Sequence, residues 1–135
     1  MIELRGFERT HPMPGNELAR VDNFKSYKEA GELAERRWVD TLEEANLVSS
    51  LVTDSDNRHR PVLDLDFPAK LIESSTPGHF HLYLNHEMSW EHYKLLLETM
   101  ATVGILEEGY VRASVAEDRQ ATFVRLPWIK KDSQD

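Results

Sequence analysis

Two carboxylates and two imidazoles stand on two short segments in which polar and apolar residues alternate. Asp64 and Asp66 belong to the first segment, and His79 and His81 to the second. Successive side chains of a β-strand point to opposite faces, so each pair would project from one face of its strand. On a strand, the two aspartates would stand ~6–7 Å apart along the chain. That spacing allows them to share one or two divalent cations.

The residues that alternate with these four are all apolar: Leu63, Leu65, Phe67, Phe80, Leu82 and Leu84. If both strands lie in one sheet over one core, their apolar side chains share the buried face. The two aspartates and two histidines would then gather on the opposite, open face. This arrangement predicts a metal or phosphate site. The same pattern is also typical of the solvated face of a half-buried sheet.

Carboxylate oxygens favour Mg²⁺ or Mn²⁺, which in turn bind phosphate oxygens. We therefore expect Asp64 and Asp66 as metal ligands. A histidine of the neighbouring strand could contact a triphosphate. The small-residue turn before that strand, with Ser75 and Thr76, offers amides and hydroxyls to a further phosphate oxygen. If His79 and His81 were both ligands beside an aspartate, Zn²⁺ or Mn²⁺ would suit a metal-dependent hydrolase.

Composition narrows the classes of protein. The 135 residues predict one domain, and the net charge of −8 argues against a general nucleic-acid coat. Cysteine is absent, which excludes disulfides and thiol catalysis. There is no apolar signal region, no run long enough for a membrane helix, no phosphate-binding Walker loop and no G-x-S-x-G motif. We expect a cytoplasmic protein that does not bind membranes.

The expected fold is α+β, a small mixed or antiparallel sheet with N-terminal helices on one face. Residues 1–24 are irregular apart from a short strand at 2–7, and the core spans residues 61–131. Capping signals predict helices at 26–37 and 41–50. The core then follows an RRM-like order of strand, strand, strand, helix, strand and strand: 62–67, 70–73, 79–84, 90–103, 110–115 and 121–126. Ser89 and Gly104 would cap the core helix, and residues 116–120 would form a hairpin loop.

Residues 62–66 (VLDLD) and 75–83 (STPGHFHLY) resemble the core of archaeo-eukaryotic primases and primase-polymerases. In that family an apolar strand carries D-x-D, and a small-residue turn runs into a strand that carries histidine. The resemblance implies metal-binding and catalytic roles for Asp64 and Asp66. It also implies a catalytic, phosphate-contacting role for His81, which directly precedes an apolar run. Residues 125–127 (RLP) look like the Arg-x-Pro segment of some members.

The resemblance implies a minimal nucleotidyltransferase-like domain with a role in DNA replication, of a size expected for a phage-encoded protein. Ser75, Thr76 and His79 would bind the nucleotide phosphates, and Arg112 or Arg125 would neutralise developing charge. The third acidic motif of the family is absent, because residues 109–115 contain no carboxylate.

A non-catalytic module on the same fold is the alternative, and the missing third carboxylate favours it. Such a module would bind a partner protein or a nucleic-acid end. Trp128, between Pro127 and Ile129, could serve as an exposed anchor for that partner, although core packing also explains a tryptophan there.

Overall fold

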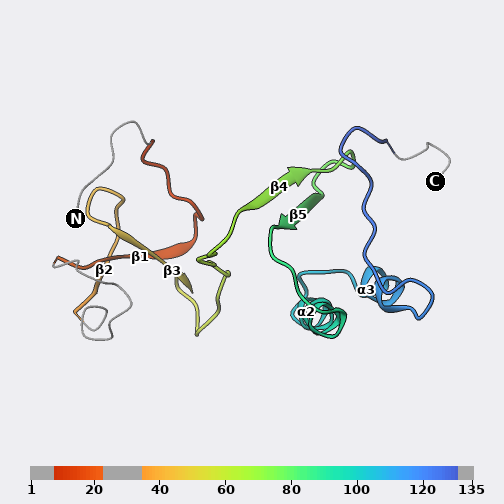
Figure 1. The fold of residues 1–135 in the computed structure, drawn as a ribbon. Coiled ribbons are helices and arrows are strands. Elements are labelled where there is room, and N and C mark those ends of the chain that lie inside the picture. The colour runs from red at the N-terminus through yellow and green to blue at the C-terminus, as the bar shows by residue number, and fades with distance from the viewer. Residues whose placement is uncertain (1–7, 23–34, 131–135) are drawn as a thin grey trace. The chain divides into compact units, whose positions relative to one another are not determined.

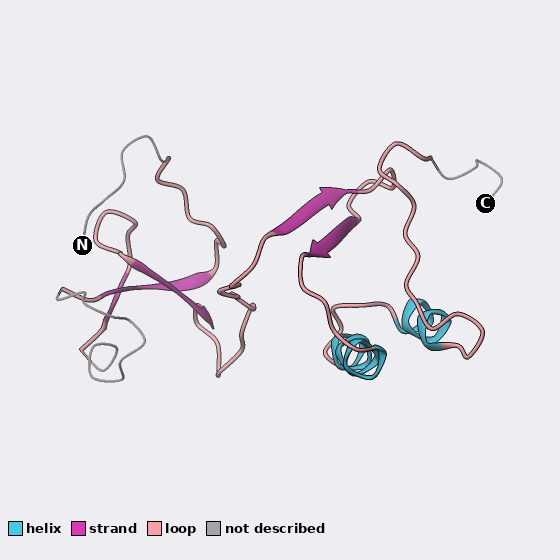
Figure 2. Cartoon of the chain, viewed as in Figure 1, coloured by secondary structure: helices cyan, strands magenta, loops and turns pink. Residues whose placement is uncertain are grey.

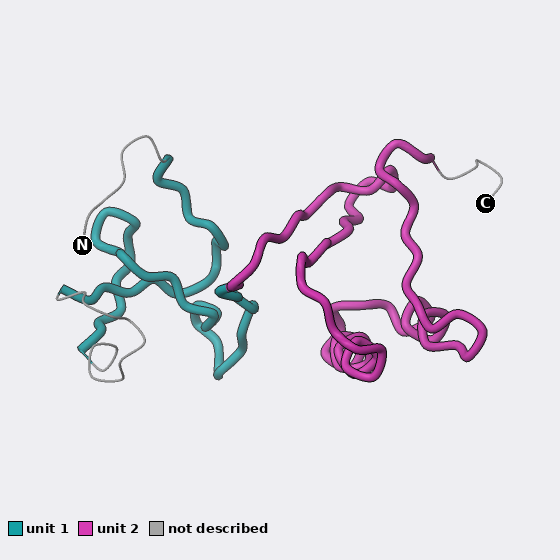
Figure 3. Tube along the Cα trace, viewed as in Figure 1, with its two compact units in different colours: residues 1–64 teal, residues 65–135 magenta. Residues whose placement is uncertain are grey.

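The computed structural model describes residues 8–22 and 35–130 and divides the chain into two compact units, residues 1–64 and 65–135 (Figure 1, Figure 3). The described residues form a three-stranded and a two-stranded antiparallel sheet together with two helices (Figure 2). This content confirms the predicted α+β class. No helix among the described residues is long and apolar enough to cross a membrane.

The first unit is built on the strands β1 (Asn16–Arg20), β2 (Arg37–Val39) and β3 (Leu47–Val52). β1 lies between the other two and is antiparallel to both. Its buried side chains, with two neighbours, form the core of this sheet: Leu18, Ala19, Val21 and Val39.

The prediction of a helix at 41–50 is wrong, although its capping signal corresponds to a real turn. The Thr41 hydroxyl donates to Glu44 Oε1 over 3.0 Å, and the Ala45 amide donates to the Thr41 carbonyl over 3.2 Å. The chain then leaves this turn and enters β3. Asn46 fixes the end of this turn beside β1. Its side-chain amide accepts a hydrogen bond from the Val21 amide (3.0 Å) and donates one to the Val21 carbonyl (2.8 Å). Pairing with β1 therefore prevails over the local helix signal.

Two other predictions concern the N-terminal half. The strand at 2–7 lies outside the described residues, as does most of the helix at 26–37. The end of that predicted helix is wrong, because Arg37 begins β2.

The second unit contains β4 (Ala69–Glu73), β5 (Phe80–Leu84), α2 (Trp90–Thr102) and α3 (Glu108–Val115). Both strands and α2 confirm the predictions. The Ser89 side chain accepts a hydrogen bond from the His92 amide over 3.2 Å, as an N-cap does. Gly104 follows the C-cap with φ +84°, a conformation that favours glycine.

The other predicted strands of the core are wrong. Residues 62–67 form no strand, and Leu63 is 72% exposed, so this segment has no core to alternate against. Residues 110–115 belong to α3, which begins where the Glu107 side chain accepts a hydrogen bond from the Gly109 amide. Residues 121–126 are irregular, so the predicted hairpin does not form. The RRM-like order therefore does not describe this unit.

The irregular segment after α3 is attached to the two helices by hydroxyl groups. Tyr93 of α2 donates to Thr122 Oγ1 over 2.7 Å, and Thr122 donates to Ser114 Oγ of α3 over 3.3 Å. Burial beside this network raises the pKa of Tyr110 above its ordinary value. From Thr122 the chain runs back to the β4–β5 ribbon, where it completes the candidate site (Figure 1).

Candidate phosphate-binding site

The β4–β5 ribbon carries the predicted histidines, and its register defines two faces. Ile72 lies opposite His81, and Lys70 lies opposite Tyr83. Residues that are directly opposite in an antiparallel pair point to the same face. The histidine side of β5 is thus confirmed as one face, and Phe80 and Leu82 lie on the other.

The apolar face, however, is not buried as predicted. Leu71, Phe80 and Leu82 are 68%, 56% and 52% exposed. The C-terminal segment instead lies over part of the opposite face, where Ile72 is half-buried and Tyr83 is 37% exposed. The alternation was correct, but the assignment of the buried side was reversed. A two-stranded ribbon has no intrinsic preference for either face, so the path of a distant segment decides which one is covered.

The turn between the strands, residues 74–79, is closed by its own polar groups. The Ser74 amide donates to the His79 carbonyl over 2.9 Å, and the His79 amide donates to the Thr76 carbonyl over 3.1 Å. The Thr76 amide donates to Ser74 Oγ over 3.1 Å. Gly78 has φ +81°, which lets the chain reverse into β5. The Ser75 and Thr76 hydroxyls therefore stand at a defined corner.

The C-terminal segment meets this corner at two points. Arg125 Nη2 donates to Thr76 Oγ1 over 3.4 Å, and the Ser75 hydroxyl donates to the Ile129 carbonyl over 3.1 Å. Three residues predicted to bind phosphate, Ser75, Thr76 and Arg125, are thus brought together across about 50 residues of sequence. Ser75 and Arg125 are exposed and Thr76 is half-buried, so the polar groups border solvent.

The two histidines differ in their surroundings. His79 is exposed in the turn. His81 is half-buried on the covered face, and its Nδ1 atom is fully buried with no hydrogen-bond partner among the described residues. A buried nitrogen that solvent cannot reach is also closed to a ligand. If His81 contacts a phosphate, it must do so through Nε2.

The remaining predicted residues belong to other segments of the chain. Arg112 lies on α3, forms an ion pair with Glu108 over 3.9 Å and lines a cavity of about 270 Å³ between α2 and α3. Asp64 and Asp66 are both exposed. Asp64 ends the first unit, and Asp66 belongs to the second.

Within residues 8–22 and 35–130, no group of three or more histidine, aspartate or glutamate side chains is arranged to hold a metal ion. The protein alone therefore does not supply a complete coordination sphere in this part of the chain. A metal held by Asp66 would need further ligands from a bound molecule.

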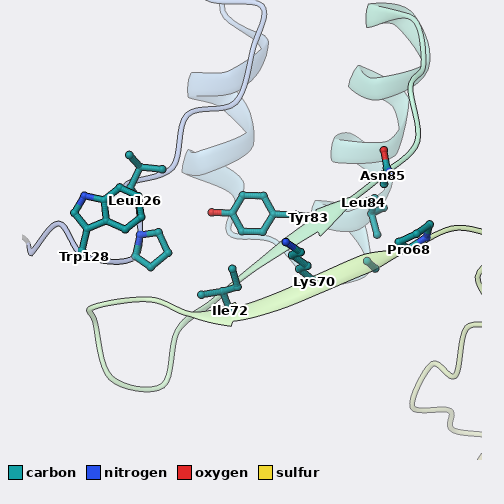
Figure 4. A pocket seen from close by; sticks show the side chains of 10 residues that line it. Pro68, Lys70, Ile72, Tyr83, Leu84, Asn85, Leu126 and Trp128 are labelled. Carbon is teal, nitrogen blue, oxygen red and sulfur yellow. The ribbon is translucent and has the colours of Figure 1, made fainter.

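The sequence prediction missed a pocket of about 540 Å³ on the covered face of the ribbon, adjoining the corner. Figure 4 shows the Tyr83 ring directed from β5 towards the segment that carries Leu126 and Trp128. One signal for it was present in the sequence. Pro127 favours the second position of a turn, and the Ile129 amide does donate to the Leu126 carbonyl over 2.9 Å.

His81→Phe should leave the free energy of unfolding unchanged or raise it by about 1 kcal/mol. A buried nitrogen without a partner costs about 1–3 kcal/mol, and phenylalanine removes it while filling similar space. Urea unfolding of both proteins measures the difference. His79→Phe, at an exposed position in the turn that precedes β5, is the control and should stay within about 0.5 kcal/mol. A clear loss of stability in His81→Phe alone would show that Nδ1 makes a stabilising contact.

Comparison with protein-family models, curated proteins and solved structures gave no match to this chain. Its function is therefore inferred from the residues and geometry of the site.

Proposed function

We propose that the second unit binds the phosphate groups of a nucleotide, as the anion-binding part of a minimal primase-polymerase-like domain. The observation that carries this proposal is the convergence of Ser75, Thr76 and Arg125 at one exposed corner. These residues come from two segments far apart in sequence. The Arg125 guanidinium and the Thr76 hydroxyl keep donors for phosphate oxygens, and the Ser75 hydroxyl would exchange its hydrogen bond to the Ile129 carbonyl for one to phosphate.

The charge of the corner supports an anionic ligand. The Arg125 guanidinium forms no ion pair within the described part of the chain. It therefore keeps most of its planar donors for a ligand, and this fork matches the oxygens of a phosphate. In a chain with a net charge of −8, an arginine held beside two hydroxyls is a local attraction for anions.

We include Mg²⁺ or Mn²⁺ in the proposal, with Asp66 of the second unit as its protein ligand. One carboxylate holds such an ion weakly, and phosphate oxygens would complete its coordination. The protein should therefore bind the metal–nucleotide complex more tightly than it binds the metal alone or the nucleotide alone. This mutual dependence is a measurable consequence of an incomplete protein site.

The test is a thermal-shift titration with Mn²⁺ alone, nucleoside triphosphate alone and both together. A ligand that binds only the folded protein raises its stability by RT ln(1 + [L]/Kd), about 2.7 kcal/mol at a hundredfold excess over Kd. We expect a small shift with triphosphate, none with Mn²⁺ and the largest shift with both.

Asp66→Asn should abolish the additional shift that Mn²⁺ produces and keep the shift from triphosphate alone. Asp118→Asn is the matched control, since Asp118 is an exposed aspartate in the loop after α3. If no condition shifts the wild-type melting temperature, the chain does not bind nucleotide phosphates. If Asp66→Asn behaves like Asp118→Asn, Asp66 is not a ligand.

The second candidate is a non-catalytic protein-binding module, and the exposed apolar face of the ribbon favours it. Exposed apolar patches commonly mark protein contacts, and Leu71, Phe80 and Leu82 lie together on one face. Two copies of the chain could pair through this face, because each copy carries the same apolar residues there. Under this candidate, sedimentation velocity shows self-association that Phe80→Asp abolishes. Under the nucleotide proposal, Phe80→Asp binds triphosphate as the wild type does.

A further inference from the structure

The pocket beside the phosphate corner has the size and lining of a small-molecule site. Its volume of about 540 Å³ falls within the range of about 300–1,000 Å³ that is usual for ligand pockets. The lining is mainly apolar, and aromatic rings come from both sides: Tyr83 from the ribbon and Trp128 from the C-terminal segment (Figure 4).

The wall that carries Trp128 is fixed by the same contacts that form the corner. Arg125 donates a hydrogen bond to Thr76 Oγ1, and the Ile129 carbonyl accepts one from the Ser75 hydroxyl. The turn at 126–129 is therefore attached to the ribbon at both ends. Trp128 itself is 72% exposed, which leaves most of its ring surface available. The corner and the pocket are therefore parts of one structure.

The rim of the pocket offers polar groups with unused hydrogen-bonding capacity. The Lys70 amine, the Tyr83 hydroxyl and the Asn85 amide make no side-chain hydrogen bond or ion pair with any described residue. Together they supply donors and acceptors around an apolar, aromatic interior. A flat heteroaromatic ring with polar edges is the ligand that suits such a lining.

We infer that this pocket holds the nucleobase of the nucleotide whose phosphates bind at the corner. The inference rests on the proposed function and adds the part of the ligand that gives affinity and base preference. The base stacks on Trp128, with Tyr83 as the opposite wall, and its edge meets Lys70 and Asn85. Base–aromatic stacking accepts every base because each has a π face, so selection among bases falls to the rim.

The experiment compares two probes, a nucleoside triphosphate and inorganic tripolyphosphate, by isothermal titration calorimetry in the same buffer. The wild type should bind the nucleoside triphosphate at least tenfold more tightly than tripolyphosphate. Trp128→Ala should lower the affinity for the nucleoside triphosphate at least tenfold and leave the affinity for tripolyphosphate unchanged. Trp128→Phe should retain part of the preference for nucleoside triphosphate over tripolyphosphate, because phenylalanine can still stack on a base.

Phe123→Ala is the matched control, because Phe123 is 74% exposed on the same C-terminal segment but does not line the pocket. It should bind both probes like the wild type. Circular dichroism checks that each variant is folded.

The outcomes separate this inference from the proposed function. If neither probe binds, the phosphate proposal fails. If both probes bind equally, or Trp128→Ala matches Phe123→Ala, the phosphate corner stands and the base pocket is overturned.

Discussion

Arg125→Ala should weaken nucleoside triphosphate binding by about 10- to 150-fold. A hydrogen bond to a charged group contributes about 1.5–3 kcal/mol, and each 1.4 kcal/mol corresponds to a factor of ten in Kd. Arg125 is exposed, and its long hydrogen bond of 3.4 Å to Thr76 Oγ1 places the guanidinium beside the hydroxyl that would share the anion. Calorimetric titration of the full chain with the triphosphate measures the change.

Arg112→Ala is the matched control, since the sequence predicted either arginine as the phosphate contact. Arg112 lies on α3 and pairs with Glu108, so its removal should leave the Kd within a factor of about two. Lower salt should increase the difference between the wild type and Arg125→Ala, because screening weakens the attraction of an exposed cation. An equal loss of affinity in both variants would indicate that positive charge in general, and not Arg125, attracts the triphosphate. A loss of affinity in Arg112→Ala alone would place the phosphate site on α3.

Local signals predicted the ribbon and α2 well. Ser89 and Gly104 act at the two ends of α2, and the alternation of residues 79–84 gives the two faces of β5. Each of these signals involves neighbours within a few residues. Such preferences hold when no distant segment competes with them.

Predictions that depended on distant partners failed. Thr41 and Glu44 form the contact expected of a helix start, yet β1 recruits the following residues into a sheet. At 110–115 the apolar spacing fits either element, and packing against α2 decides for the helix, with Val111 and Ser114 buried three residues apart.

The candidate site illustrates the same limit. Their residue types identified Ser75, Thr76 and Arg125 separately as phosphate ligands. They come together through two hydrogen bonds whose partners are 54 and 49 residues apart in sequence. The pocket beside them arises from those same long-range bonds. Its lining therefore could not be read from local pattern.

Leu97→Ala should lower the free energy of unfolding of the second unit by about 2–5 kcal/mol. Removing a buried leucine side chain loses its burial energy and leaves a cavity. Leu97 is 3% exposed and is the only buried residue of α2. A loss of this size is large against the roughly 5–15 kcal/mol that stabilise a typical domain. Urea unfolding followed by helical circular dichroism measures it, because both described helices belong to the second unit.

Leu95→Ala, two residues away on the same helix, provides the control. Leu95 is 62% exposed, and alanine has the highest helix propensity, so the change should stay within about 0.5 kcal/mol. An exposed leucine has little burial energy to lose. Equal losses of unfolding free energy in the two variants would therefore contradict the different burial of Leu97 and Leu95. Because the helices anchor the segment leading to Arg125 through Thr122, Leu97→Ala should also weaken triphosphate binding at urea concentrations that leave the wild type folded.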